Sequence, residues 1–185
     1  MTTNPNVTIT NMELTPMQVK FKQNATDVAA TDIGATLDNV VITAKYGKAE
    51  LKADQYGNSV LDRRVNEITV QVTTSIAEVQ NKDVLKILYP HATVIDSGGN
   101  KALDFNTNVG DSDLANAGEL TLHPLSKDPA DVSADWTFYN ACSSADSEFS
   151  YGPNDQVKAK LVWNILPDLT VTPPRWFRYG DPSLV

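Results

Sequence analysis

The clearest pattern along the chain is a strict alternation of apolar and polar residues over positions 67–77. The apolar positions are Ile68, Val70, Val72 and Ile76, and the polar positions between them are Glu67, Thr69, Gln71, Thr73 and Ser75. Because successive side chains of a strand point to opposite faces of a sheet, this spacing predicts a strand with a core face and a wet face.

A second alternating run covers residues 156–165. Its apolar positions are Val157, Ala159, Leu161, Trp163 and Ile165, and its other positions are Lys158, Lys160, Val162 and Asn164. Two long strands with one polar face each predict a sheet that is exposed to water on one side.

Shorter runs predict the remaining elements. We expect strands over 18–22, 36–45, 49–53, 119–124 and 136–141, with Lys45-Tyr46-Gly47 offering a turn or bulge that pairs 49–53 back on 36–45. Polar turns or loops are expected over 24–32, 54–58, 97–100 and 106–118. Asn81 is placed to cap a helix over 82–88 that Pro90 ends, and Val84, Ile87 and Leu88 would lie on the apolar face of the sheet.

These elements fit one mainly β domain over 17–167, flanked by an N-terminal arm, 1–16, and a C-terminal arm, 168–185. The arm 1–16 is polar and carries one strand-like run over 7–10. A chain of 185 residues with 41% hydrophobic and 21% charged residues is typical of a single soluble domain.

There is no apolar run of about 20 residues and no signal-peptide pattern at the start, so we expect a protein that is made and used in a cytoplasm. A single cysteine, Cys142, agrees, and we interpret it as a small buried apolar residue.

The net charge of −8 is unevenly distributed. Residues 96–155 hold 11 acids and 2 bases, a net of −9, so the other residues sum to +1. Such a segment repels nucleic-acid phosphates. It is either a solvated flank or an acidic surface that DNA passes without sticking.

Motifs for catalysis or cofactor binding are not found. His91 and His123 lack a metal-ligand spacing, and the sequence has no phosphate-binding loop and no nucleophile elbow. Asp111-Ser112-Asp113 lacks the later glycine and glutamate of a calcium loop. We therefore expect no enzyme, metal or cofactor, and the pairs Arg63-Arg64 and Arg175/Arg178 favour contacts with carboxylates over DNA.

The order of these motifs resembles that of the major tail tube proteins of long-tailed bacteriophages, over roughly residues 17–181. The resemblance rests on an Asp-x-Gly entry at Asp32, a strand pair, an Asp-x-Tyr-Gly loop at Asp54 with Asp62-Arg63, and a strand that ends in Ala77-Glu78. Later matches are the strands over 119–124 and 136–141, Trp163-Asn164-Ile165-Leu166-Pro167-Asp168, and Phe177-Arg178-Tyr179-Gly180-Asp181. Residues 1–16 and the acidic insert 96–118 match least.

The resemblance implies a non-enzymatic virion structural protein, made in the cytoplasm of the bacterial host and located in the virion tail. Its fold would be an antiparallel β-sandwich or half-barrel with one short flanking helix. Six copies would close a ring whose inner sheets join into one β-barrel, and stacked rings would conduct the genome. Expected partners are further copies of the chain, a tape measure protein inside the tube, and tail terminator or tip proteins; DNA passes without specific binding, and no membrane contact is implied.

Two sets of residues follow as site candidates. The lumen-lining candidates are Glu67, Thr69, Gln71, Thr73, Ser75, Lys158 and Lys160. We expect the lining to be polar and net negative, with Lys158 and Lys160 as the exceptions. The inter-ring contact candidates are Asp54, Tyr56, Asp62, Arg63 and Arg64, because a loop this charged has no obvious partner within its own domain.

Two alternatives remain open. One is a related structure, the inner tube or a tail-completion ring of a contractile injection machine. The other is a monomeric β-sandwich that binds carbohydrate, which would usually expose a cluster of aromatic residues. Trp136 and Trp163 instead fall on strands with apolar neighbours, and only Trp176 lies in a tail.

Overall fold

The structure is a computed structural model that describes residues 15–184 except 24–28, 107–108, 145–147 and 152–156. The strand-like run expected over 7–10 lies outside the described residues. The strands are β1 (Met17–Gln23), β2 (Thr31–Asp32), β3 (Thr36–Lys52), β4 (Val60–Ile76), β5 (Thr93–Ser97), β6 (Asn100–Asp104), β7 (Gly118–Pro124), β8 (Trp136–Ser143), β9 (Glu148–Ser150), β10 (Lys158–Leu166) and β11 (Phe177–Tyr179). The helix is α1 (Lys82–Leu88), and the short 3-10 turns are η2 (Asp54–Tyr56), η3 (Leu114–Asn116) and η4 (Val132–Ala134).

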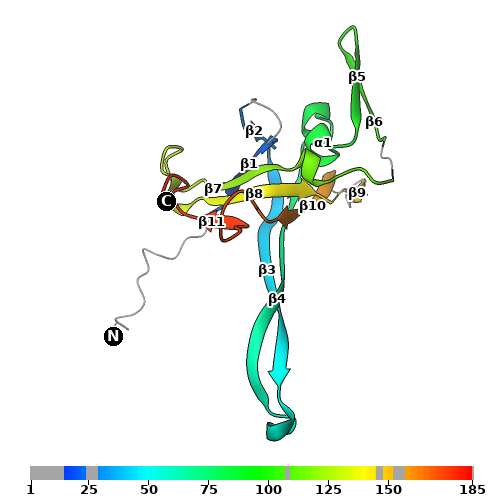
Figure 1. The fold of residues 1–185 in the computed structure, drawn as a ribbon. Coiled ribbons are helices and arrows are strands. Elements are labelled where there is room, and N and C mark those ends of the chain that lie inside the picture. Colours follow the sequence, from blue (N-terminus) through cyan, green and yellow to red (C-terminus); the bar gives the residue numbers. More distant parts are fainter. Residues whose placement is uncertain (1–14, 24–28, 107–108, 145–147, 152–156, 185) are drawn as a thin grey trace.

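Nine of these strands form one antiparallel sheet in the order β2-β1-β7-β8-β10-β4-β3. The remaining two members lie off this path, with β9 paired to β10 and β11 paired to β8. The strands β5 and β6 form a separate hairpin next to α1 (Figure 1). The expected mainly β, antiparallel fold with one short flanking helix is thereby confirmed over the described residues.

The large sheet curls around its own core. The rings of Phe21 in β1 and Trp163 in β10 have centroids only 4.9 Å apart, although β7 and β8 separate these strands in the sheet. The helix α1 contributes Val84 and Leu88 to the same apolar cluster. This curvature gives the half-barrel shape, and Trp163 and Phe138 are fully buried in it.

The helix α1 begins and ends where the sequence predicts. The Asn81 side chain accepts hydrogen bonds from the backbone N–H groups of Asp83 at 3.1 Å and Val84 at 3.4 Å, so it caps the helix. Among the described residues, no helix is both long and apolar enough to cross a lipid bilayer.

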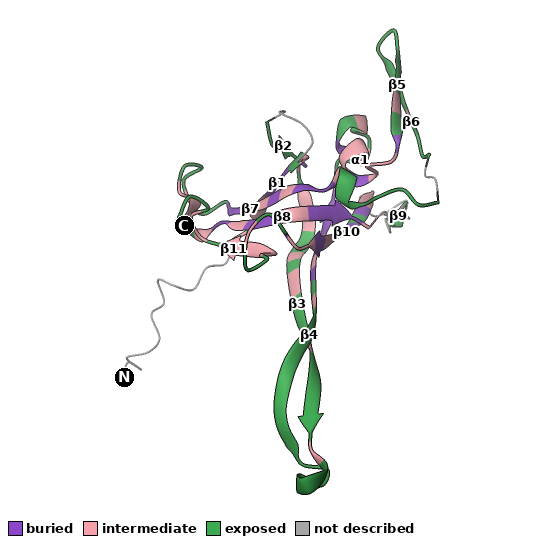
Figure 2. Cartoon of the chain, viewed as in Figure 1, coloured by how far each residue is buried: buried purple, intermediate pink, exposed green. Residues whose placement is uncertain are grey.

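The hairpin formed by β3 and β4 corrects the predicted strand boundaries. The sequence predicts that 49–53 folds back on 36–45, but β3 runs on without a turn to Lys52, and both segments pair with β4. The pairing register shifts between Gly47 and Lys48, so the bulge, not the turn, forms there. The fourth strand starts at Val60 instead of residue 67, and the turn lies at η2. Figure 1 shows this hairpin extending far below the body of the molecule, and Figure 2 shows that its lower part is exposed.

Five other strands were not predicted, namely β5, β6, β9, β11 and the two-residue β2, which lies at the end of the loop expected over 24–32. The turn expected over 97–100 joins β5 to β6, two strands that no alternation in the sequence indicates. The strands β9 and β11 are three residues long each. Through β11, the segment after Pro167 returns to the sheet, where Trp176 and Phe177 pack against the core.

Candidate assembly surfaces

The polar sides of β4 and β10 form one continuous surface because these strands are neighbours. Ser75 lies opposite Lys160 and Gln71 opposite Asn164 in the antiparallel register. Directly opposed residues share a face of the sheet. The Gln71 side chain donates a 2.9 Å hydrogen bond to Asn164 Oδ1, which joins the two strands on this side. The structure thus brings the lumen-lining candidates of both strands together on what we call the polar face.

Ser75 departs from this pattern, because it is buried although its neighbours on the polar face are more open. Opposite it, the pairing of β3 shifts between Leu37 and Val41, and Asp38 takes a positive φ of 64°. The Asp38 carboxylate accepts a 3.0 Å hydrogen bond from Lys158. Hydrogen bonds from Lys158 and then Ser75, with the charge of Lys158, hold the pKa of Asp38 below its ordinary value. Lys158 therefore has a carboxylate partner within its own chain.

The charges on the polar face are balanced. Lys160 lies opposite Glu148 of β9, and Lys45 lies on the same side of β3, opposite Thr69. The acids on this face are Asp38, Glu67 and Glu148, and the bases are Lys45, Lys158 and Lys160. The strongly negative balance of the chain therefore does not come from this face.

The lower part of the β3–β4 hairpin continues the core face of the sheet into solvent. Val70 and Val72 are buried on that face, but Tyr46 and Val65 further along the hairpin are both 53% exposed. Three exposed apolar residues lie along this side, each in a different cross-strand pair of β3 and β4. Basic residues outnumber acidic ones on the same side. We call this surface the hairpin stripe; its apolar residues are Tyr46, Val60 and Val65, and its charged residues are Lys48, Glu50, Lys52 and Arg63.

The inter-ring contact candidates all lie at this lower end. Asp54 and Tyr56 form η2 at the tip, and Asp62, Arg63 and Arg64 lie at the start of β4. The sequence suggests no partner for these arginines within their own domain, but both have a carboxylate of the same chain nearby. Arg63 lies 3.1 Å from Glu50 across the hairpin, and Arg64 lies 3.5 Å from Asp62, with all four side chains exposed. Exposed pairs of this kind contribute little to stability, so their side chains can exchange partners.

The histidines take part in local contacts. His123 Nδ1 lies 2.7 Å from Asp135 Oδ1, and both side chains are buried. His91 lies between Asp111 and Asp113, at 3.7 Å and 3.6 Å. Within the described part of the chain, no group of three or more histidine, cysteine or acidic residues is arranged to hold a metal.

Cys142 is buried, and this burial raises the pKa of its thiol to about 11.

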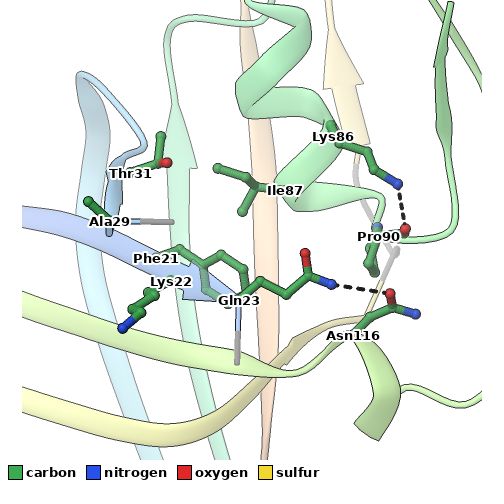
Figure 3. A pocket seen from close by; sticks show the side chains of 9 residues that line it. All are labelled: Phe21, Lys22, Gln23, Ala29, Thr31, Lys86, Ile87, Pro90 and Asn116. Carbon is green, nitrogen blue, oxygen red and sulfur yellow. Dashed lines mark hydrogen bonds between the residues drawn. The ribbon is translucent and has the colours of Figure 1, made fainter. Parts of the chain in front are cut away.

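A small cavity lies between α1 and β1 (Figure 3), where Phe21, Ile87 and Pro90 form apolar walls. Gln23 donates to Asn116 at 3.4 Å, and Lys86 donates to the carbonyl of Pro90 at 2.7 Å. The volume of the cavity, about 200 Å³, is below the range of about 300–1,000 Å³ that is usual for small-molecule sites. This cavity therefore gives no evidence of a small-molecule site.

No protein-family model matches the sequence, and no curated protein matches it either. The fold does match that of a solved structure. It is similar to a chain in the cryo-EM structure of the anti-feeding prophage (AFP) baseplate, which was symmetrised six-fold. The TM-score is 0.52 at 10% sequence identity, and the match covers 94% of this chain and 97% of that chain.

Proposed function

We propose that this chain is a structural subunit of a phage-like injection machine, in which six copies close a ring and the rings stack into a tail tube. The observation that carries self-assembly is the β3–β4 hairpin, which extends from the body with its lower faces exposed. A two-stranded ribbon has no core of its own. Exposed apolar residues at successive positions of such a ribbon call for a second surface to cover them.

The type of assembly is supported by the fold. The similarity to a chain of a six-fold baseplate covers nearly the whole of both chains. The order of motifs in the sequence resembles tail tube proteins independently of that comparison. A ring in which each sheet continues into that of its neighbour would also cover the outer edge of β3, which lies at the end of the strand order.

The polar face is the surface we assign to the lumen. Glu67 and Thr69 are exposed, and Gln71 and Thr73 are half-buried, so all four present polar groups. Lys158 and Lys160 extend this face on β10, and Ser75 lies beneath the Asp38–Lys158 pair. A conduit for DNA needs a polar lining without a basic excess, because many phosphate contacts would hold the duplex.

A ring within a contractile baseplate is the second candidate. It is favoured by the origin of the similar chain, which comes from a baseplate. Both candidates are non-enzymatic structural roles, and they differ in whether many rings stack or only one forms. In the tail tube, the tape measure protein would occupy the lumen, and terminator or tip proteins would close the ends.

Negative-stain microscopy of the purified, concentrated protein, combined with mass measurement, tests the proposal. Rings alone would support the baseplate candidate, and long tubes would support the tail tube. A monodisperse monomer at high concentration would contradict both and would favour the carbohydrate-binding module.

The inter-ring role of the hairpin has a separate test. We expect Arg63→Glu/Arg64→Glu to block stacking of rings, because the two reversed charges would repel the carboxylates they meet across the contact. Circular dichroism and the thermal midpoint should stay close to the wild type, since both side chains are exposed. Tubes of normal length from this variant would exclude the arginines from the contact.

A further inference from the structure

The two hairpins of the molecule leave the body in opposite directions. In Figure 1 the β3–β4 hairpin extends downwards, and the β5–β6 hairpin extends upwards from α1. The two hairpins are offset sideways, so stacked copies would need a rotation between rings as well as translation along this direction to bring the lower hairpin of one copy to the upper hairpin of the next. The acidic insert, which includes β6 and part of β5, is also the part of the chain that least resembles tail tube proteins.

The β5–β6 hairpin is fixed in place by contacts with α1 and with Tyr89 at the end of that helix. Lys101 binds the Asp83 carboxylate of α1 at 2.9 Å, and Phe105 meets Tyr89 edge-to-face at 4.7 Å. Leu103 packs against the core. A ribbon of five residues per strand is marginal alone, so these contacts explain how it can stand out from the body.

The exposed side of the β5–β6 hairpin is both apolar and acidic. Ile95 is 47% exposed and lies opposite Ala102, and Phe105 next to β6 is 59% exposed. Residues 93–116 hold four acids, Asp96, Asp104, Asp111 and Asp113, against one base, Lys101, which is already paired with Asp83. Ile95, Ala102 and Asp104 share one face of the hairpin, whereas Asp96 lies opposite Lys101 on the other face, which contacts α1. We call Ile95, Ala102 and Asp104 the upper patch.

The hairpin stripe has the complementary character. Its charged residues are three bases and one acid, and its apolar residues are exposed like those of the upper patch. The six residues from Lys48 to the turn would carry it about 20 Å beyond Gly47, at roughly 3.3 Å per residue. Strands in a closed barrel tilt by about 35–45° from its axis, so the hairpin of a lumen-lining strand runs mainly along the tube and beyond the ring edge.

From these observations we infer that the hairpin stripe of each copy docks on the upper patch of a copy in the next ring. The contact is heterologous, since the two surfaces differ, and a heterologous contact repeated by rotation and translation generates a filament instead of a closed dimer. This inference rests on the proposed stacking of rings and names the surface that receives the hairpin.

A charge exchange tests the assignment. Lys48→Glu/Lys52→Glu and Asp104→Lys should each shorten tubes to single rings or stubs, because each puts like charges on both sides of the contact. The chain that carries all three substitutions should recover tubes, because the charges on the two sides of the contact are again of opposite sign. Lys22→Glu/Lys127→Glu makes the same charge change outside both hairpins and should leave tube length unchanged.

The outcomes separate the contact from the function. If the wild type forms no rings, the proposed function fails. If the wild type forms tubes and the Lys48→Glu/Lys52→Glu variant forms equally long ones, the upper patch is not the receiving surface and the function stands. The same conclusion follows if the triple variant does not recover tubes.

Cross-linking gives a second measurement that does not depend on charge reversal. A chain with Val65→Cys and Ile95→Cys should give a ladder of multimers with a short bis-maleimide, because the two thiols lie at opposite ends of one copy and meet between copies. Either single variant should stay monomeric, because its thiol meets no second thiol across the contact. The buried Cys142, with a pKa of about 11, stays unreactive near neutral pH. Only monomers and dimers from the double variant, under conditions where tubes form, would overturn the inference.

Discussion

At the residue scale, Asp168 fastens the end of the chain to the sheet. Its carboxylate accepts hydrogen bonds from the Thr170 hydroxyl at 2.6 Å, the Thr170 N–H at 3.0 Å and Arg175 Nε at 2.9 Å. Arg175 in turn lies 3.8 Å from the centre of the Tyr139 ring. The hydrogen bonds from Thr170, followed by that from Arg175, hold the pKa of Asp168 below its ordinary value of 3.8.

We therefore predict that Asp168→Asn lowers the free energy of unfolding by about 1–2 kcal/mol at pH 7, because a charged acceptor is lost. A carboxyl whose pKa is lower in the folded state stabilises the fold above its unfolded pKa, and this contribution disappears as the pH falls through the folded value. The difference from the wild type should accordingly shrink below about pH 4 in urea titrations. Asp181→Asn, at an exposed position with similar Ser183 contacts, is the control and should have a smaller effect. A loss that does not change between pH 7 and pH 2.5 would show that the charge of Asp168 is not responsible.

The sequence predicts individual faces well where one side of a strand is buried. Val70 and Val72 are buried as the alternation indicates, and Gln71 and Thr73 lie on the other side. It fails at Ser75, which was expected to be wet. The pairing of the neighbouring strand β3 is irregular beside it, at Asp38. Asp38 is distant in the sequence, so nothing local to residues 67–77 could signal this irregularity.

At the element scale, the lower β3–β4 hairpin should be the least protected regular structure of the free subunit. Few buried contacts support its backbone hydrogen bonds beyond Gly47. We predict that amides of 48–52 and 60–65 exchange with deuterium much faster than those of 70–76 in monomers, and that they become protected on assembly. Mass spectrometry of peptides from monomers and tubes measures this. Equal exchange of 48–65 in both forms would mean that the hairpin makes no contact in the tube.

The same exposure explains why the extent of the hairpin was not predicted. With no buried face, Asp62, Arg63 and Arg64 show no alternation, so the start of β4 looks like a loop. Lys45-Tyr46-Gly47 suits a turn or a bulge equally, and only the pairing with β4 decides between them. The short strands β9 and β11 gain their partners from distant segments, and three residues carry no periodicity.

At the scale of the whole molecule, the lumen should not bind DNA. The polar face itself carries three acids and three bases, so it does not by itself supply a net negative charge. The expectation of a net-negative lining stays a prediction. We expect tubes to show no retention of duplex DNA at physiological salt. Glu67→Lys/Thr69→Lys should introduce salt-sensitive retention, since each ring would gain a basic girdle. Retention by wild-type tubes would contradict a lumen built for passage, and retention by neither kind of tube would place this face away from the DNA.

A cryo-EM reconstruction of the assembled protein tests the central claim most directly, because it gives the rotational symmetry and the orientation of each sheet together. We predict stacked six-fold rings, with the β3, β4 and β10 strands facing a hollow lumen through Glu67, Thr69, Gln71, Thr73 and Lys160. Particles that are only monomers or two-fold dimers would contradict the claim, as would rings whose polar face is turned outwards.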